Sequence, residues 1–171
     1  MDTTAKEILW RQFGGALDMF TNAVLNCPED LWLARLWEED YNPALAEFWY
    51  IGYHTLFWLD LYLSGTVEGF TPPAPFSLEE LDPKGIVPSP PYTKEQLLAY
   101  IEHGRRKCQT ITMQLTDEQI IRECHFPWET VSYGEVLLHN MRHVQEHGAQ
   151  LNMFLGQQKG IKARWVAKTK E

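Results

Sequence analysis

Three histidines stand four residues apart in the stretch LLHNMRHVQEHGAQL, at His139, His143 and His147. In a helix, side chains at positions i and i+4 meet on one face, so two neighbouring imidazoles of this series could bind one metal ion. His139 and His147 are separated by a rise of about 12 Å, which is too far for both to reach the same ion. The spacing therefore predicts one chelating pair and one histidine outside it.

A helical wheel distinguishes between the two possible pairs. At about 100° per residue, His147 lies about 40° from His143 on the side of the apolar residues. His139 lies about 40° away on the other side, toward the charged face that includes Glu146. The wheel favours His143 and His147 as the ligands and leaves His139 as a neighbouring group.

Two histidines make an incomplete site, because catalytic zinc usually takes three protein ligands and keeps one position for water. His54, in FWYIGYHTLFWLDLYL, is the other histidine in a strongly apolar helical context. His103 lies among polar residues and His125 in a stretch without clear periodicity, so His54 is the best third ligand by context. A second interpretation stays open, in which these are hydrogen-bonded core histidines with no metal.

Four segments have the apolar periodicity of helices and must position these residues. The pattern predicts helices over 4–25, 43–64, 93–115 and 132–157, with capping boxes at Thr93 and Ser132. The segment 65–92 holds most of the ten prolines and predicts a long connection. No strand pair is predicted. We therefore expect an all-α fold, a four-helix bundle with two short links and one long crossover, in which helix 43–64 is the most buried.

Composition limits the classes of protein that remain. We expect one domain over residues 1–171, with a solvated basic tail from about residue 158. The formal net charge of −8 argues against nucleic-acid binding. No apolar run reaches the roughly 18 residues of a membrane span, and no signal peptide opens the chain, so we expect a cytoplasmic protein. The three cysteines have no CxxC spacing, and apolar helix faces favour a homodimer.

The chain resembles the DinB/YfiT-like metalloenzymes. The resemblance rests on the histidine in YIGYHTLFWLDLYL, the long connection, and SYGEVLLHNMRHVQEHGAQL, where HxxxH is followed by Gly and Gln. It implies an up-up-down-down bundle and a three-histidine site at His54, His143 and His147. It also implies zinc or nickel as the metal, and a low-molecular-weight thiol that is transferred to a small-molecule substrate. The basic residue that family members commonly have after the last histidine is absent here.

Other functions stay open at this stage. HVQEH has the H-x-x-E-H form of a metal-dependent hydrolase with Glu146 as general base, but an acidic ligand further along the chain is lacking except for Glu171. A di-iron bundle would need paired Glu-x-x-His motifs, and none occurs. The remaining alternative is a non-enzymatic helical stress or interaction protein whose metal site is structural or vestigial.

Overall fold

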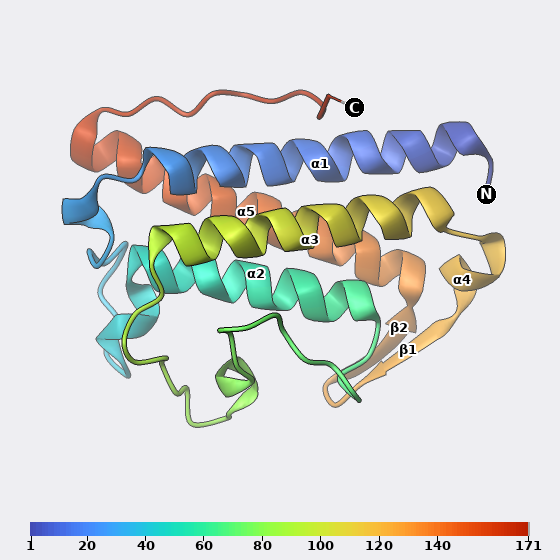
Figure 1. Cartoon of the computed structure of the whole chain (residues 1–171), viewed down its shortest axis with the longest axis horizontal. Helices are drawn as coiled ribbons and strands as arrows, with labels where there is room; N and C mark the ends of the chain where they lie inside the picture. The colour runs from blue at the N-terminus through green and yellow to red at the C-terminus, as the bar shows by residue number, and fades with distance from the viewer. Residues whose placement is uncertain (171) are drawn as a thin grey trace.

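Four long helices lie side by side in the computed structural model, which describes residues 1–170 (Figure 1). They are α1 (Thr3–Asn26), α2 (Phe48–Ser64), α3 (Lys94–Gln114) and α5 (Tyr133–Lys159). The shorter elements are 3-10 turns at Glu29–Leu31, Pro43–Ala46 and Glu79–Leu81, helix α4 (Asp117–Ile121), and strands β1 (Glu123–Phe126) and β2 (Glu129–Ser132). The predicted helical fold class is confirmed.

Local sequence signals place most of the helix ends. Thr93 and Ser132 each complete a capping box, with Gln96 and Glu135 respectively, as predicted. Gly65 ends α2 in the left-handed region, with φ of 70°, which glycine adopts without a steric penalty. The start of α2 was predicted too early, because Pro43–Ala46 forms a 3-10 turn and the α-helix begins only at Phe48.

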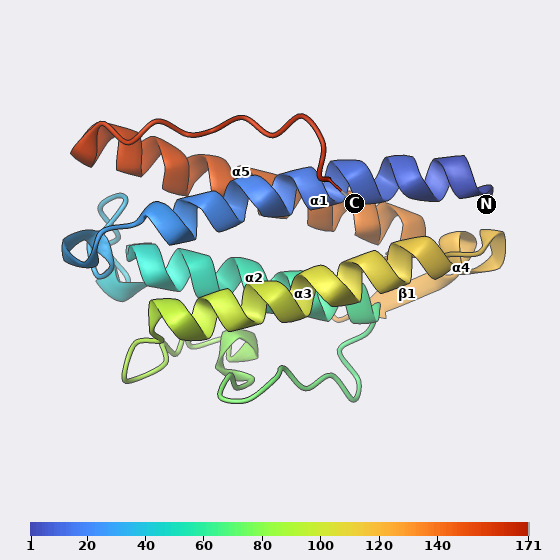
Figure 2. The ribbon, with the colours of Figure 1, turned by 45° about the horizontal axis from the view of Figure 1, so that its top comes forward.

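The predicted up-up-down-down order is wrong, and the helices run up, down, down and up. Helix α1 packs against α3 and α5, and α2 packs against the same two helices, so α1 and α2 occupy opposite corners (Figure 2). Helix α2 is parallel to α3 and antiparallel to α1 (Figure 1). An up-up-down-down bundle needs two long crossovers. This chain has one, residues 65–92, and the segment 27–47 folds into tight turns that reverse its direction.

A β-hairpin occupies part of the stretch for which no strand pair was predicted. Strands β1 and β2 pair antiparallel, with Phe126 opposite Glu129, and only Pro127 and Trp128 form the turn. The turn lacks the Asn-Gly or Asp-Gly signal of two-residue hairpins, and each strand has only four residues. Side-chain burial alternates along β1, where Cys124 and Phe126 point inward. Packing against the bundle therefore stabilises a hairpin whose turn is not diagnostic.

Helix α2 is the most buried helix of the bundle, as predicted. Along its 17 residues, only His54, Trp58 and Ser64 are not fully buried. Such a helix buries apolar surface against several neighbours, and this burial favours the folded state. Among the described residues, no helix is long and apolar enough to cross a membrane.

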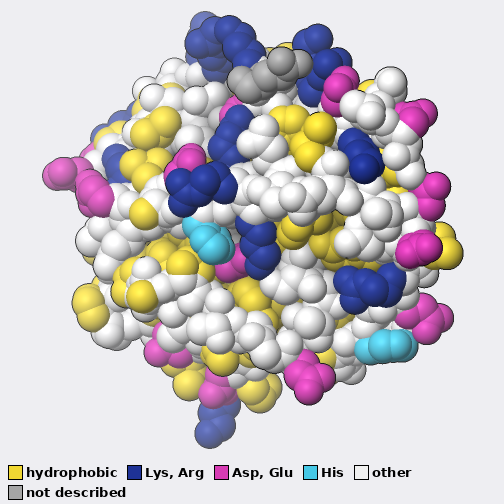
Figure 3. Space-filling model, turned by 45° about the vertical axis from the view of Figure 1, so that its right-hand side comes forward, with side chains coloured by type: hydrophobic (Ala, Val, Ile, Leu, Met, Phe, Trp, Pro, Cys, Tyr) yellow, Lys and Arg dark blue, Asp and Glu magenta, His cyan; other side chains and the backbone are white. Residues whose placement is uncertain are grey.

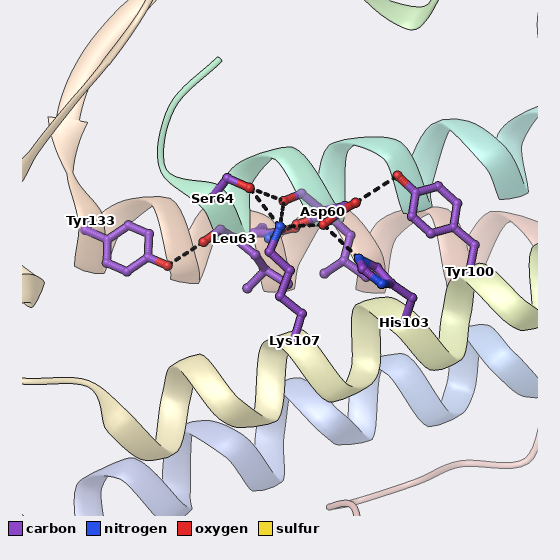
Figure 4. A network of polar contacts seen from close by, with 9 residues as sticks. Asp60, Leu63, Ser64, Tyr100, His103, Lys107 and Tyr133 are labelled. Atoms are coloured by element: carbon purple, nitrogen blue, oxygen red, sulfur yellow. Dashed lines mark hydrogen bonds and ion pairs between the residues drawn. The ribbon is translucent and has the colours of Figure 1, made fainter. Parts of the chain in front are cut away.

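A polar network joins the parallel helices α2 and α3 inside this apolar core (Figure 4). The ammonium group of Lys107 donates to the carboxylate of Asp60 at 2.5 Å and to the hydroxyl of Ser64 at 2.7 Å. The hydroxyl of Tyr100 donates to the other carboxylate oxygen of Asp60 at 3.2 Å, and His103 lies 3.4 Å from the first. Asp60 is 1% exposed, so these partners compensate a charge that has left water.

The basic end of the chain returns along α1. Residues 162–165 are exposed, as expected of a solvated tail, but Thr169 is 4% exposed. The backbone N–H of Thr169 donates to the carbonyl of Arg11 at 2.9 Å, and Arg105 donates to its hydroxyl at 2.7 Å. Gly14 permits this approach, because a Cβ there would lie 2.4 Å from Thr169 Cγ2. The predicted solvated tail is therefore wrong at its end, where α1 and α3 supply bonding partners.

Charges of both signs share the surface at one end of the bundle. Figure 3 shows Lys and Arg side chains interspersed with Asp and Glu side chains, and hydrophobic side chains exposed between them. On this face the net negative charge is therefore dispersed rather than gathered into one acidic block.

Candidate metal centre

The three histidines selected from the sequence meet in space. Helix α2 supplies His54, and α5 supplies His143 and His147. The Nε2 atom of His143 lies 3.3 Å from Nε2 of His54 and 3.1 Å from Nε2 of His147. One ring nitrogen from each residue lies within 4.8 Å of the other two, an arrangement that could hold a metal ion.

Antiparallel packing of α2 on α5 fixes the register that brings these residues together. The side-chain amide of Asn140 donates to the carbonyl of Leu59 at 3.0 Å, and the hydroxyl of Tyr133 donates to the carbonyl of Leu63 at 2.6 Å. Both bonds are buried, so a shift of one helix turn would leave polar groups without partners. This register sets His54 opposite the space between His143 and His147.

In His54 and His147, the Nδ1 atom that points away from the cluster has a hydrogen-bond acceptor. Nδ1 of His54 contacts the carboxylate of Glu80, which reaches it from the 3-10 turn Glu79–Leu81 of the crossover. Nδ1 of His147 lies 2.7 Å from the side-chain oxygen of Gln150. Nδ1 of His143 is buried without a hydrogen-bond partner. An Nδ1–H that donates to an oxygen leaves Nε2 with its lone pair, so His54 and His147 both direct lone pairs at the same point.

The donor set fits a divalent cation. Lone pairs that face one another at 3.1–3.3 Å repel unless a proton or a cation lies between them. Two nitrogens that bind zinc at about 2.0–2.1 Å in a tetrahedral arrangement are about 3.3 Å apart, which is the spacing seen here. All three imidazoles are half-buried, so solvent reaches one side of the cluster. Three protein nitrogens with one accessible side match a centre that keeps an open coordination position.

The environment keeps two of these imidazoles, those of His143 and His147, neutral. Burial, followed by the imidazoles of His54 and His147, lowers the pKa of His143 from 6.5 to about 2. Burial and His54 also lower the pKa of His147. Neutral imidazole is the form that binds metals, so His143 and His147 are in their binding form at neutral pH.

The depressed pKa of His143 predicts a stability that falls in acid. The unfolded chain binds a proton at this residue below about pH 6.5, whereas the folded chain does not, so stability is complete above that value. Below it, each pH unit should remove about 1.4 kcal/mol until the pH approaches the folded pKa. Urea unfolding of the metal-free protein at about pH 7, 6 and 5 measures this slope. The variant His143→Gln should give a shallower slope, and equal slopes would contradict the assignment.

The other candidates lie outside the cluster. His139 is exposed and packs edge-on against Tyr62, with ring centroids 5.1 Å apart. Glu146 is exposed and lines a surface groove with Trp165 and residues of α1, and its charge only partly opposes the lowering of the His147 pKa by burial. His103 belongs to the α2–α3 polar network and His125 to β1. Proximity in sequence therefore does not bring His139 into the group of three nitrogens.

Sequence reasoning assigned no role to three groups around the site. Glu80 is bonded to His54 but lies in a proline-rich segment without periodicity, so no spacing could identify it. Gln150 follows His147 by three residues, and helical spacing could have identified it. Trp128, in the hairpin turn, packs edge-on against Trp58 with ring centroids 5.3 Å apart and brings the hairpin close to His54.

Comparison with known proteins gives one match. The family model of the DinB superfamily matches residues 12–151, a range that includes all three histidines and the crossover. Searches of curated proteins and of solved structures gave no match.

Proposed function

The chain belongs to the DinB superfamily, and we propose that it is a metal-dependent enzyme that transfers a low-molecular-weight thiol to a small electrophilic substrate. In this proposal His54, His143 and His147 bind a divalent ion, Zn²⁺ or Ni²⁺. One observation carries it, the convergence of three half-buried imidazole nitrogens at a point that solvent reaches. The thiol transfer that the resemblance to DinB/YfiT-like metalloenzymes implies supports the choice of reaction.

The side chains around the site prepare it for this chemistry. Glu80 and Gln150 fix the outward nitrogens of His54 and His147, so the inward nitrogens are held as lone-pair donors. A divalent ion held by these donors would supply an open position at which a thiol loses its proton. Trp58 packs against His54, and Trp128 packs against Trp58, so the two indoles offer apolar surface to a substrate beside the site.

The chain's own cysteines are poor nucleophiles. Burial raises the pKa of Cys27 to about 12, and burial raises the pKa of Cys108 and of Cys124 as well. A thiol with such a pKa is almost entirely protonated at neutral pH, and the thiolate is the reactive form. The transferred sulfur is therefore proposed to come from an external thiol. Its S–H proton passes to solvent, an S–C bond forms to the electrophile, and the leaving group departs with its electron pair.

The test begins with elemental analysis of the purified protein and continues with Co²⁺ in place of the native metal. We expect about one metal per chain. Adding cysteine or glutathione to the Co²⁺ protein should produce a thiolate-to-cobalt charge-transfer band, because the thiolate occupies the open position. Mass spectrometry of a reaction with a small alkylating electrophile should then show the thiol conjugate forming faster than without protein. S-methyl analogues of the thiols should give neither signal.

Results other than the expected ones favour another function or overturn the proposal. Bound metal with no response to any thiol favours a structural or vestigial site in a non-enzymatic protein. Thiol-independent hydrolysis that is lost in Glu146→Gln favours the hydrolase. A protein that binds no metal after incubation with Zn²⁺, Ni²⁺ or Co²⁺ overturns the proposal.

A further inference from the structure

The crossover places a carboxylate inside the bundle. Glu80 belongs to the 3-10 turn Glu79–Leu81, in the middle of the connection between α2 and α3. Its side chain is 6% exposed, whereas Leu78, two residues earlier, is 48% exposed. An apolar side chain at the surface beside a buried carboxylate is the reverse of the usual distribution. Burying an ionised carboxylate is unfavourable unless donors compensate it.

Three donors from one face of α2 compensate Glu80. The hydroxyl of Tyr50 donates to Oε2 at 2.8 Å, the indole N–H of Trp58 donates to Oε1 at 3.0 Å, and Nδ1 of His54 contacts Oε1. These residues are spaced by four, so they form a single row along the helix. Two of the three, His54 and Trp58, are among the few α2 residues that are not fully buried. The three side chains of this row together bind one carboxylate, that of Glu80.

The contact decides which nitrogen of His54 carries the proton. A carboxylate only accepts hydrogen bonds, so the imidazole donates from Nδ1. In the neutral ring Nε2 then has a free lone pair, and this atom is the one that lies 3.3 Å from Nε2 of His143. With the opposite tautomer, His54 would direct an N–H at the centre and could not act as a ligand there.

We propose that Glu80 is the positioning residue of the metal centre, which it controls from the crossover. It holds His54 in the Nδ1–H tautomer and directs Nε2 at His143 and His147. The consequence for metal affinity rests on the proposed function, whereas the tautomer is a property of the metal-free chain. The crossover thus does more than connect two parallel helices, because the site reaches its full affinity only when residue 80 is in place.

The first measurement is made on the metal-free protein. Two-dimensional ¹H–¹⁵N spectra of the imidazole nitrogens, assigned with His54→Gln, should show His54 in the Nδ1–H form. In Glu80→Ala the acceptor is gone, and His54 should show a mixture of tautomers. Glu79→Ala is the matched control, since Glu79 lies in the same turn and accepts from the hydroxyl of Ser77. It should leave the tautomer of His54 unchanged.

The second measurement is Zn²⁺ affinity by competition with a chelating dye. Glu80→Ala should bind about 10–100-fold more weakly than the unchanged protein, the usual effect of losing a group that orients a ligand. Glu80→Gln keeps an acceptor oxygen but loses the charge, so its affinity should fall between the two. It also keeps the size of the side chain, which provides a folded variant if Glu80→Ala unfolds.

Tyr50→Phe separates positioning from a purely structural role. This variant loses the bond to Oε2 but keeps the contact between Oε1 and His54. If Glu80 acts through His54, Tyr50→Phe should keep the tautomer and bind Zn²⁺ within about threefold of the unchanged protein. A loss in Tyr50→Phe as large as in Glu80→Ala would show that Glu80 only anchors the crossover, and would overturn the proposal.

The failure of this proposal differs from the failure of the proposed function. If the unchanged protein binds no metal and Glu80→Ala still alters the tautomer of His54, the enzyme proposal fails and the positioning role stands. If metal binds but His54 keeps one tautomer in both Glu80→Ala and Glu80→Gln, the positioning role fails and the metal centre stands.

Discussion

His147→Ala should lower the affinity of the chain for Zn²⁺ more than about 100-fold, beyond the usual effect of losing an orienting group, because it deletes a ligand outright. Nε2 of this residue lies 3.1 Å from Nε2 of His143, and its other nitrogen lies 2.7 Å from Gln150. The remaining pair, His54 and His143, would be a two-coordinate fragment, which cannot hold zinc in its usual geometry. Elemental analysis after gel filtration, with chelator competition, measures the effect.

His139→Ala is the matched control for this prediction. It removes an imidazole of the same helix, two turns before His147, that is exposed and packs on Tyr62. It should keep the metal content and Zn²⁺ affinity of the unchanged protein. A fully metallated His147→Ala protein would place the metal elsewhere, and equal losses in both variants would point to a general effect on α5.

Lys107→Met should destabilise the fold by about 3 kcal/mol, because it leaves the Asp60 carboxylate buried without its cation. Asp60 is 1% exposed, and Lys107 also donates to its backbone carbonyl at 2.9 Å. Tyr100 and His103 remain as partners, which keeps the loss at the lower end of the range for a broken buried pair. Urea unfolding at neutral pH measures the difference.

Arg106→Met is the matched control for the stability loss, at the residue before Lys107. Arg106 pairs with Glu102 at 3.1 Å, and both side chains are more than half exposed, so the variant should lose less than about 1 kcal/mol. The double variant Asp60→Leu with Lys107→Met removes both charges and should recover part of the loss. If Lys107→Met and Arg106→Met lose equal stability, the Asp60 network does not hold α2 to α3.

The sequence alone predicted the four long helices and the three histidines that cluster in the structure. Periodicity and capping boxes placed α3 and α5, because these signals act within a few residues of one another. The helical wheel separated His143 and His147 from His139 for the same reason, since a helix turns every residue by a fixed angle. His54 was selected by its apolar context and not by any spacing to the other two.

Tertiary packing decided the order of the helices and the groups that support the site. The direction of α2 depends on how residues 27–47 fold against the bundle, and no periodic signal encodes that turn. The hairpin β1–β2 depends on the burial of Cys124 and Phe126 against the helices, because its turn lacks a diagnostic sequence.

Glu80 is the clearest example of a site residue that sequence patterns could not predict. It is 26 residues from His54 in the chain, in a segment whose prolines exclude a long helix, and only the folded crossover brings the two together. The sequence thus determined which side chains could bind a metal, because ligand types and helical spacing are local properties. Tertiary structure decided whether they meet and which nitrogen each presents, because those depend on contacts between segments far apart in the chain.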